Sequence, residues 1–387
     1  MTNPPSTHAA TVSGTPLDDY TVRVKIVLGG TRGTATFQIS FDGGDTYSEV
    51  YVTAASVTTW ATETGLTIAF AVGTYVAGDI YAFTSTGPKF GSSDLATALD
   101  NLNASAYSFE WVHIAGTVTG ADDAAKVTAF AALAAAVETK LTTWTTAFRY
   151  AFAILQVPTV ADSALNVSGV TGFASTRQMW VAGDVELVSA INARQIRRNA
   201  SLNVAARLGA IDLQRSPACP ADGTLPGIVS LVRDERITEA LDALRITTLR
   251  TFDSAFAGHY VTNGRMMAPA GSDYAFVQNR RVMDRAATVA RQAMIPYVNA
   301  DFRVDAVTGF IDEREAVAIE SRITRALEGD LVATGRATRV QVQVKRDDHL
   351  ISTQTLNVRI RVIPKSYARF ITLDLGFENP ALAAAAT

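Results

Sequence analysis

The sequence QTLNVRIRVIPKSYARFITLDLGFENP, residues 354–380, contains two segments in which polar and apolar residues alternate. The first segment covers 355–364 and ends at Pro364, and the second covers 368–377. A period of two is typical of β-strands that bury one face, and strand pairing often stops at proline. Because chain ends normally carry little order, we expect the last segment to belong to a sheet.

In this last segment the side chains separate onto two faces. The apolar face has Ile371, Leu373 and Leu375, and the other face has Phe370, Thr372 and Asp374. An apolar strand with an unpaired edge is an aggregation hazard. We therefore expect another strand to cover it.

The composition indicates a sizeable core and a balanced charge. Of the 387 residues, 48% are hydrophobic and 18% are charged, which argues against disorder as the dominant state. At about 100–200 residues per domain, this length allows several domains. The 34 basic and 37 acidic residues give a net charge of -3, and this balance gives no sign of nucleic-acid binding.

Cysteine and histidine usage indicates neither a disulfide framework nor a metal site. Cys219 is the single cysteine, and the four histidines are scattered without metal-ligand spacing. The first residues lack the basic and apolar regions of a signal peptide, and no stretch of about 18 apolar residues predicts a membrane-spanning helix. We expect folding in the cytoplasm, no membrane insertion and no cofactor.

The first part of the chain predicts a small antiparallel domain. Residues 1–17 are rich in Pro, Ser and Thr, and we interpret them as a flexible arm. Residues 18–90 contain short alternating segments between Gly and Asp turns, which predict a β-sandwich. Two glycine-rich stretches, GGTRG at 29–33 and FDGGDTYS at 41–48, lack the residues of a phosphate or calcium loop, so we interpret both as turns.

The rest of the chain predicts a mixed α/β or α+β fold with several domains. Residues 91–260 alternate between strands and helices, which predicts an α/β domain. Its main expected elements are strands at 108–116, 148–158 and 177–189 and helices at 121–147, 199–211 and 237–244. Residues 261–387 predict helices at about 272–293 and 312–327, and then strands at 339–347, 355–364 and 368–377.

Two of these helices are rich in arginine. Arg281 and Arg285 lie four residues apart, which suits either an ordinary amphipathic helix or a basic face for an acidic partner. The second helix interleaves Asp312, Glu313 and Glu320 with Arg314, Arg322 and Arg325. Paired carboxylates can act in acid–base catalysis, but this interleaving favours a salt-bridged or partner-facing helix. No Ser-His-Asp set or metal cluster is evident, so we expect no enzymatic activity.

Several stretches together resemble the contractile phage tail sheath family, in the family's order and over most of residues 12–380. Residues 13–48 and 64–90 resemble the outer β-domain of certain sheath proteins. Residues 258–286, 308–323 and 355–380 resemble the carboxyl-terminal core. The resemblance implies that residues 261–387 are the sheath core.

The resemblance implies a structural subunit of a contractile tail. Its hexameric rings would stack around an inner tube and contract to drive that tube through a target envelope. Its partners would be further copies of itself, the tube protein, and baseplate and tail terminator proteins, with no nucleic acid, and its location the virion tail. Relatives carry an amino-terminal portion before the outer domain, so we expect either a shortened subunit or a piece supplied by another polypeptide.

The resemblance also assigns roles to named residues. Terminal arms of sheath proteins cross to neighbouring subunits and complete their sheets by β-augmentation. The arm here would comprise Arg369, Phe370, Ile371, Thr372, Leu373, Asp374, Leu375 and Phe377. A core helix would face the tube through charge, first with Arg314, Arg322 and Arg325 and second with Arg281 and Arg285.

Two other classes of protein remain open from the sequence. One is another virion structural or adhesion protein with a sandwich domain, although the α/β region at 91–260 counts against a tube protein. The other is an α/β enzyme with an accessory β-domain, against which the missing catalytic set counts. Polymerisation would favour the sheath, and turnover by a monomer would favour the enzyme.

Overall fold

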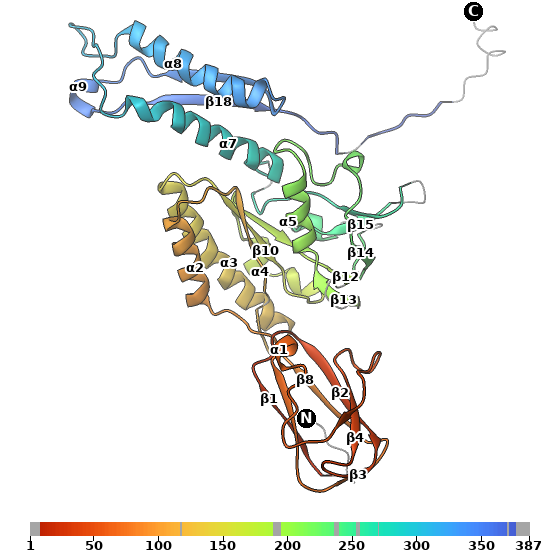
Figure 1. The fold of residues 1–387 in the computed structure, drawn as a ribbon. Helices are drawn as coiled ribbons and strands as arrows, with labels where there is room; N and C mark the ends of the chain where they lie inside the picture. Colours follow the sequence, from red (N-terminus) through yellow and green to blue (C-terminus); the bar gives the residue numbers. More distant parts are fainter. Residues whose placement is uncertain are drawn as a thin grey trace, which may run out of the picture. The chain divides into compact units, whose positions relative to one another are not determined.

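The computed structural model describes residues 8–116, 118–188, 195–235, 240–252, 256–269, 271–369 and 371–376. The chain divides into two compact units, Met1–Gly91 and Ser92–Thr387, each described separately below (Figure 1). The predicted boundary between 260 and 261 within the second unit stays a prediction.

The first unit is built from antiparallel strands. Its largest sheet has the order β5–β4–β2–β8, and two smaller pairs are β1–β6 and β3–β7. These strands are β1 (Ala10–Gly14), β2 (Tyr20–Leu28), β3 (Gly30–Thr31), β4 (Thr36–Ser40), β5 (Tyr51–Val52), β6 (Leu66–Phe70), β7 (Thr74–Tyr75) and β8 (Ile80–Ser85), and the short helix α1 covers Ala61–Thr64. Alternating residues such as Val22, Val24 and Ile26 enter one shared core. The sandwich classification itself stays a prediction.

The predicted flexible arm at 1–17 is wrong for the residues of β1. Ala10–Gly14 pairs antiparallel with β6, with Val12 opposite Ile68. Ala10 is buried and Val12 packs against the core. The Pro, Ser and Thr content suggested a loop, but Thr and Val are also strand formers and here find a partner strand.

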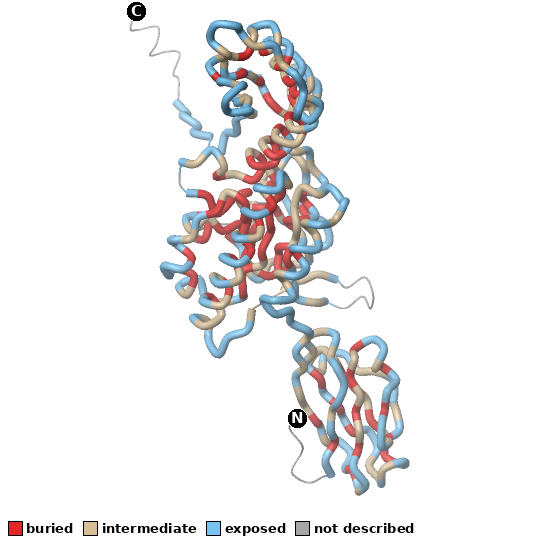
Figure 2. The backbone as a smooth tube through the Cα atoms, turned by 90° about the vertical axis from the view of Figure 1, so that its left-hand side faces the viewer, coloured by how far each residue is buried: buried red, intermediate tan, exposed pale blue. Residues whose placement is uncertain are grey.

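The second unit contains a parallel three-stranded sheet with both faces covered. Its order is β11 (Gln178–Val181), β10 (Phe152–Gln156) and β9 (Trp111–Ile114). On β10, Ala153 and Leu155 pack with helices α2 (Ser92–Ala104) and α3 (Asp123–Thr146). Phe152 and Ile154 point to the opposite side, where α5 (Ser201–Ala210) packs. The first four residues of β10 are all buried, which is typical of parallel strands in α/β proteins. Figure 2 shows buried residues gathered in the interior of this unit.

Smaller elements complete this part of the second unit. Strands β13 (Gln195–Asn199), β12 (Asp184–Val188) and β14 (Ile228–Leu231) form an antiparallel sheet, and β15 (Leu249–Thr251) pairs with β16 (His259–Val261). The short helical elements are η1 (Asp162–Leu165), α4 (Ser168–Thr171), η2 (Pro220–Asp222) and α6 (Ala240–Ala243).

The carboxyl-terminal layer packs two long helices against a β-hairpin. Helices α7 (Val277–Met294) and α8 (Glu313–Leu327) share a core with strands β17 (Ala337–Val344) and β18 (Val358–Pro364). The connecting elements are η3 (Ile295–Tyr297), the π-helical turn η4 (Glu328–Val332) and α9 (Leu350–Thr353). Asp312 caps α8 by accepting a hydrogen bond from the Arg314 N–H, which explains where this helix begins.

The fold confirms the predicted mixed α/β class, with several small sheets, but the last predicted strand is not formed. Residues 371–376 have no helix or strand, and Phe370 and Phe377 lie outside the described residues. Within the described ranges, no helix is both long enough and apolar enough to cross a membrane.

Candidate assembly interface

The β17–β18 hairpin has backbone groups that point away from it on both sides. The Lys345 N–H donates to the Asn357 carbonyl at 2.8 Å, so this pair faces the inside of the hairpin. Because backbone direction alternates along a strand, the backbone groups of Val358, Ile360 and Val362 point outward from β18. The two strands form a sheet of their own, and no described residue pairs with these groups.

The outer edge of β17 is partly occupied. The Val344 N–H, which points outward, donates to Glu320 Oε1 on α8 at 2.7 Å. Glu320 shares Arg346 with Glu313, whose Oε2 lies 2.7 Å from Arg346 Nε. The edge of β18 therefore offers more free backbone groups than the edge of β17.

The two faces of the hairpin differ in character. The half-buried Val358, Ile360 and Val362 pack on the core shared with α7 and α8. The exposed Arg359 lies opposite Gln343 and the exposed Arg361 opposite Gln341. The hairpin thus pairs an apolar face with a cationic, amide-rich face, an alternation that a third strand could continue.

The terminal segment presents a matching alternation without a partner. Ile371, Leu373 and Leu375 are 87%, 81% and 87% exposed. Three large aliphatic side chains in one short extended segment are costly to leave in water, at about 1.5–3 kcal/mol for each one fully buried elsewhere. The segment predicted as a donated strand is therefore available for another chain, and the donation itself stays a prediction.

The residues just before this segment are attached to the body of the second unit. Arg369 Nη2 lies 2.5 Å from Asp242 Oδ2, and the Tyr367 hydroxyl donates to the Gln214 carbonyl. Burial alone would raise the pKa of Asp242, but hydrogen bonds and charge from Arg265 and Arg369 outweigh it and lower that pKa. These contacts fix the point at which the terminal segment leaves the body.

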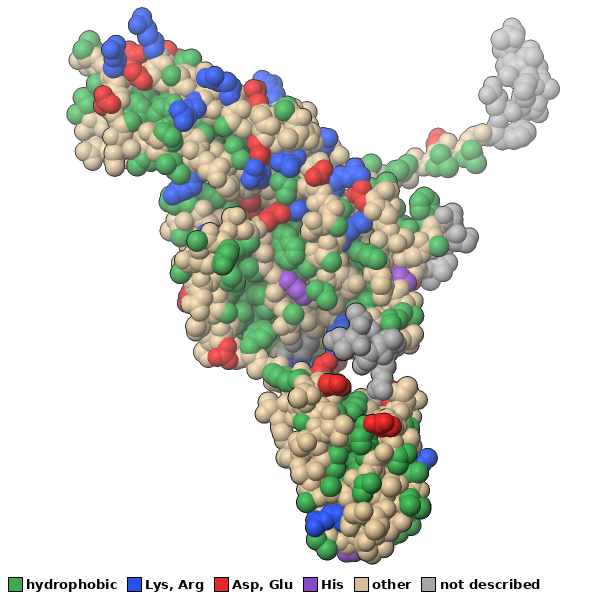
Figure 3. Space-filling view, in the orientation of Figure 1, with side chains coloured by type: hydrophobic (Ala, Val, Ile, Leu, Met, Phe, Trp, Pro, Cys, Tyr) green, Lys and Arg blue, Asp and Glu red, His purple; other side chains and the backbone are tan. Residues whose placement is uncertain are grey.

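Helix α8 displays the first set of predicted tube-facing arginines. Arg314, Arg322 and Arg325 are all exposed, and none has a carboxylate partner among the described residues. Arg322 lies 5.4 Å from the Tyr297 ring centroid, and Arg325 Nε donates to the Ser321 carbonyl of its own helix. In Figure 3, Lys and Arg side chains gather over the carboxyl-terminal layer. Binding of these arginines to a tube stays a prediction.

The second set of predicted tube-facing residues forms ion pairs within this chain, and its contact with a tube stays a prediction. The side chain of Arg281 is 3% exposed, and its Nε lies 2.5 Å from Glu110 Oε1. Arg285 Nη2 lies 2.5 Å from Asp330 Oδ1, and this hydrogen bond raises the pKa of Arg285. The cause is that α7 packs on both the α/β layer and the hairpin layer, so its polar side faces other parts of the protein.

A buried charge network at the middle of α7 joins these two layers. Arg177 Nη1 lies 3.1 Å from Asp284 Oδ2, and Arg280 Nη2 lies 2.5 Å from Asp284 Oδ1. All three side chains are at most 10% exposed. One carboxylate thus compensates two guanidinium groups, and sequence reasoning missed this because Arg177 is remote in sequence from α7.

The side chains with catalytic potential have other roles here. Hydrogen bonds from Arg346 lower the pKa of Glu313 and of Glu320, so both remain ionised as its partners. The His113 ring nitrogen Nε2 lies 3.0 Å from the Ser201 hydroxyl, and burial lowers the pKa of His113. Among the described residues, no group of His, Cys, Asp and Glu could hold a metal ion.

The fold is similar to that of chains from the anti-feeding prophage (AFP). One similar structure is a chain of the AFP baseplate, at a TM-score of 0.55 and 17% identity, covering 77% of this chain and 76% of that one. A second is a chain of the AFP helical sheath in its contracted state, at a TM-score of 0.53 and 16% identity, covering 78% of this chain and 79% of that one. At these identities the likeness establishes the fold. The predicted resemblance to sheath proteins is confirmed at that level.

Sequence comparison places the chain in a family. Residues 27–265 match the family profile described as "DUF2586, N-terminal domain", and residues 273–382 match "DUF2586, C-terminal domain". The first match alone covers more than half of the chain, so this protein belongs to the DUF2586 family. No curated protein matches it in sequence.

Proposed function

We propose that this chain is the structural subunit of a contractile tail sheath, with no enzymatic activity. The observation that carries the proposal is that one chain contains both a free strand edge and an unpaired segment with the alternation of a strand. The hairpin β17–β18 has a free edge, and residues 371–376 form an exposed alternating segment that is not folded onto it. The fold shared with AFP sheath and baseplate chains supports this reading.

In the assembly, residues 369–377 of one copy add as a strand to the hairpin of a neighbouring copy. Main-chain hydrogen bonds join the strand to the free edge, and Ile371, Leu373 and Leu375 extend the apolar side of the hairpin. Main-chain pairing does not depend on the angle between the bodies of two subunits. The lattice can therefore rearrange from an extended to a contracted state while its subunits stay linked.

The exposed face of α8 contacts the inner tube. Arg314, Arg322 and Arg325 provide positive charge without carboxylate partners among the described residues, which suits an acidic tube surface. Each exposed ion pair contributes only about 0–1 kcal/mol. Contacts of this strength can hold a metastable extended sheath and still break when it contracts.

Contraction draws its free energy from two packings of one lattice. A modest difference per subunit, summed over hexameric rings, is enough to drive the tube, so no nucleotide site is required. Baseplate and tail terminator proteins complete the particle at its two ends.

Negative-stain electron microscopy of the purified full-length chain tests this function. We expect hollow cylinders with cogwheel cross-sections, alone or on a tube protein. The matched control is a chain that lacks 371–387, which keeps Tyr367 and Arg369 but should not polymerise. A monomer that stays monomeric with a tube protein would contradict the sheath assignment, and isolated rings that never stack would favour a baseplate component.

A further inference from the structure

The two edges of the β17–β18 hairpin differ in the charge that an added strand would meet. On the solvent face of β18, Arg359 and Arg361 have no carboxylate partner among the described residues. On β17, the residues opposite them are Gln341 and Gln343, which carry no charge, and the cation on this face of the strand, Arg339, lies further along, opposite Ile363. An acidic side chain on an added strand would therefore be attracted to β18.

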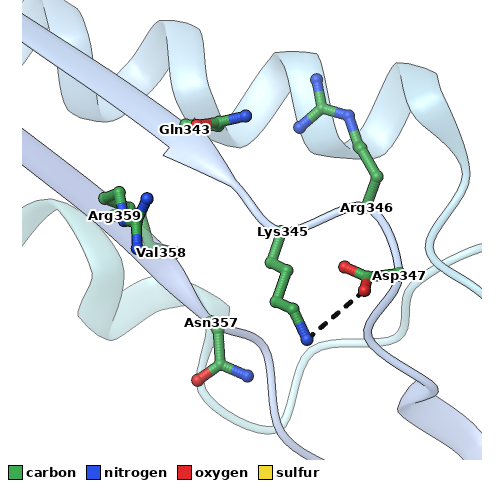
Figure 4. Close-up of a pocket in the computed structure, with 7 residues that line it drawn as sticks. All are labelled: Gln343, Lys345, Arg346, Asp347, Asn357, Val358 and Arg359. Carbon is green, nitrogen blue, oxygen red and sulfur yellow. Dashed lines mark ion pairs between the residues drawn. The ribbon is translucent and has the colours of Figure 1, made fainter.

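Negative charge at the outer edge of β17 strengthens this difference, because Glu320 accepts a hydrogen bond from the outward Val344 N–H there. A hollow of about 770 Å³ is lined by both strands, with Gln341 and Gln343 of β17 and Arg359 and Arg361 of β18, and by Glu313 and Glu320 of α8. The two carboxylates share the guanidinium of Arg346. Another hollow, of about 790 Å³, lies at the α9 end of the hairpin (Figure 4). There Lys345 is paired with Asp347, whereas Arg359 is not paired with any described carboxylate.

The terminal segment contains one acidic residue among its described positions. Asp374 is exposed and has no partner among the described residues. It lies on the polar face of the alternation, opposite Leu373 and Leu375. If the apolar side chains of an added strand face the helices, as those of β18 do, Asp374 must lie on the same face of the sheet as Arg359 and Arg361.

We propose that the edge of β18 is the acceptor for the terminal segment of a second copy, and that Asp374 of that copy selects it by pairing with Arg359 or Arg361. This rests on the strand donation proposed above. With Leu373 beside Ile360, an antiparallel strand brings Asp374 to Arg359 and a parallel strand brings it to Arg361. A slip of one residue would turn Asp374 toward the apolar side, so its charge also fixes the register.

Reversing the charges of Asp374 and of Arg359 and Arg361, first separately and then together, provides the test. Asp374→Arg should raise the protein concentration needed for assembly about tenfold, because an attractive cross-strand pair becomes a repulsive one. Combining it with Arg359→Asp and Arg361→Asp should restore assembly toward the wild-type concentration. Sedimentation of polymers and electron microscopy provide the readout, and unchanged unfolding midpoints of the monomers show that each variant folds.

Arg339→Asp is the matched control. Arg339 is on the same solvent face but on β17, so this change should neither mimic nor rescue Asp374→Arg. Rescue by Arg339→Asp would overturn the assignment of β18. Wild-type-like assembly of Asp374→Arg would overturn the charge pairing, while loss of assembly on removing 371–387 would still support strand donation. Normal assembly without 371–387 would instead contradict the proposed function.

Discussion

Helices α7 and α8 look alike in sequence and differ in what their arginines do. On α7, Arg280 and Arg281 are buried and paired with Asp284 and Glu110. On α8, the arginines Arg314, Arg322 and Arg325 are exposed and lack carboxylate partners among the described residues. The first helix uses positive charge to hold two layers of one subunit together, and the second displays it to the outside.

This difference follows from what each helix packs against. Helix α7 contributes Val277 to the core of the α/β layer and Val282 and Ala286 to the core of the hairpin layer. It therefore has little surface left for a partner. Helix α8 buries one stripe, with Ile319 and Ile323, and leaves the other stripe in solvent. Substitutions on the two helices should accordingly separate loss of stability from loss of assembly.

The largest effect is expected at Asp284. Replacing Asp284 with Ala leaves Arg177 and Arg280 as buried cations without their shared carboxylate. Breaking a buried ion pair in this way costs about 3–5 kcal/mol in the free energy of unfolding. Urea unfolding measures it, with Arg314→Ala on α8 as the control, expected within about 0.5 kcal/mol of wild type. Equal effects of both substitutions would remove the distinction between the helices.

A smaller loss is expected at Arg281. The variant Arg281→Met leaves Glu110 without its guanidinium, but Glu110 is 28% exposed, so water recovers part of the loss. We expect a loss of about 2 kcal/mol, and of less than about 1 kcal/mol for Arg285→Met, because the side chain of Arg285 is 43% exposed. The unfolding free energies of the two variants provide the comparison. A larger loss of stability from Arg285→Met than from Arg281→Met would show that burial does not determine which ion pair stabilises the protein more.

The ion pair of Arg369 is intermediate in burial between the pairs of α7 and the exposed arginines of α8, because the partly exposed Arg369 meets the buried carboxylate of Asp242. Arg369→Gln should cost about 1 kcal/mol at neutral pH. The folded state lowers the pKa of Asp242, so the stabilisation is present above the ordinary aspartate pKa and is lost as the pH falls through the lowered value. The difference between variant and wild type should shrink in acid, and a constant difference from neutral to acidic pH would rule out the ion pair as its source.

The smallest effect on stability is expected on α8. Reversing Arg314 and Arg325 to Glu should change the free energy of unfolding by less than about 0.5 kcal/mol. The same double variant should weaken assembly templated by a tube protein and leave spontaneous polymers unchanged. Co-sedimentation with the tube protein distinguishes the two. Unimpaired assembly on the tube would remove α8 from that contact.

The sequence predicted periodic elements well and tertiary contacts poorly. Helix α8 was expected at 312–327 and observed at Glu313–Leu327, because an Asp cap and a regular apolar stripe are local signals. Helix α2 was missed, although Leu95, Leu99 and Leu102 recur at helical spacing. The ion pairs of Arg281 and Arg285 were missed because no local pattern identifies Glu110 or Asp330 as their partners.

The terminal segment shows a further limit of sequence reasoning. Its alternation predicts a strand, but a strand needs a neighbouring edge, and residues 371–376 pair with none in the part of the chain that the structure describes. The free edge of β18 is equally invisible in the sequence, because it depends on the register between β17 and β18. Only the two observations together suggest donation to a second copy.

Hydrogen–deuterium exchange on assembled and monomeric protein tests the central claim most directly. In the monomer, the outward amides of Val358, Ile360 and Val362 and those of 371–376 should exchange rapidly. In the polymer both segments should become protected together. A chain that lacks 371–387 should form no polymer, and the amides at its hairpin edge should stay unprotected. Polymers in which both segments still exchange as fast as in the monomer would contradict strand donation.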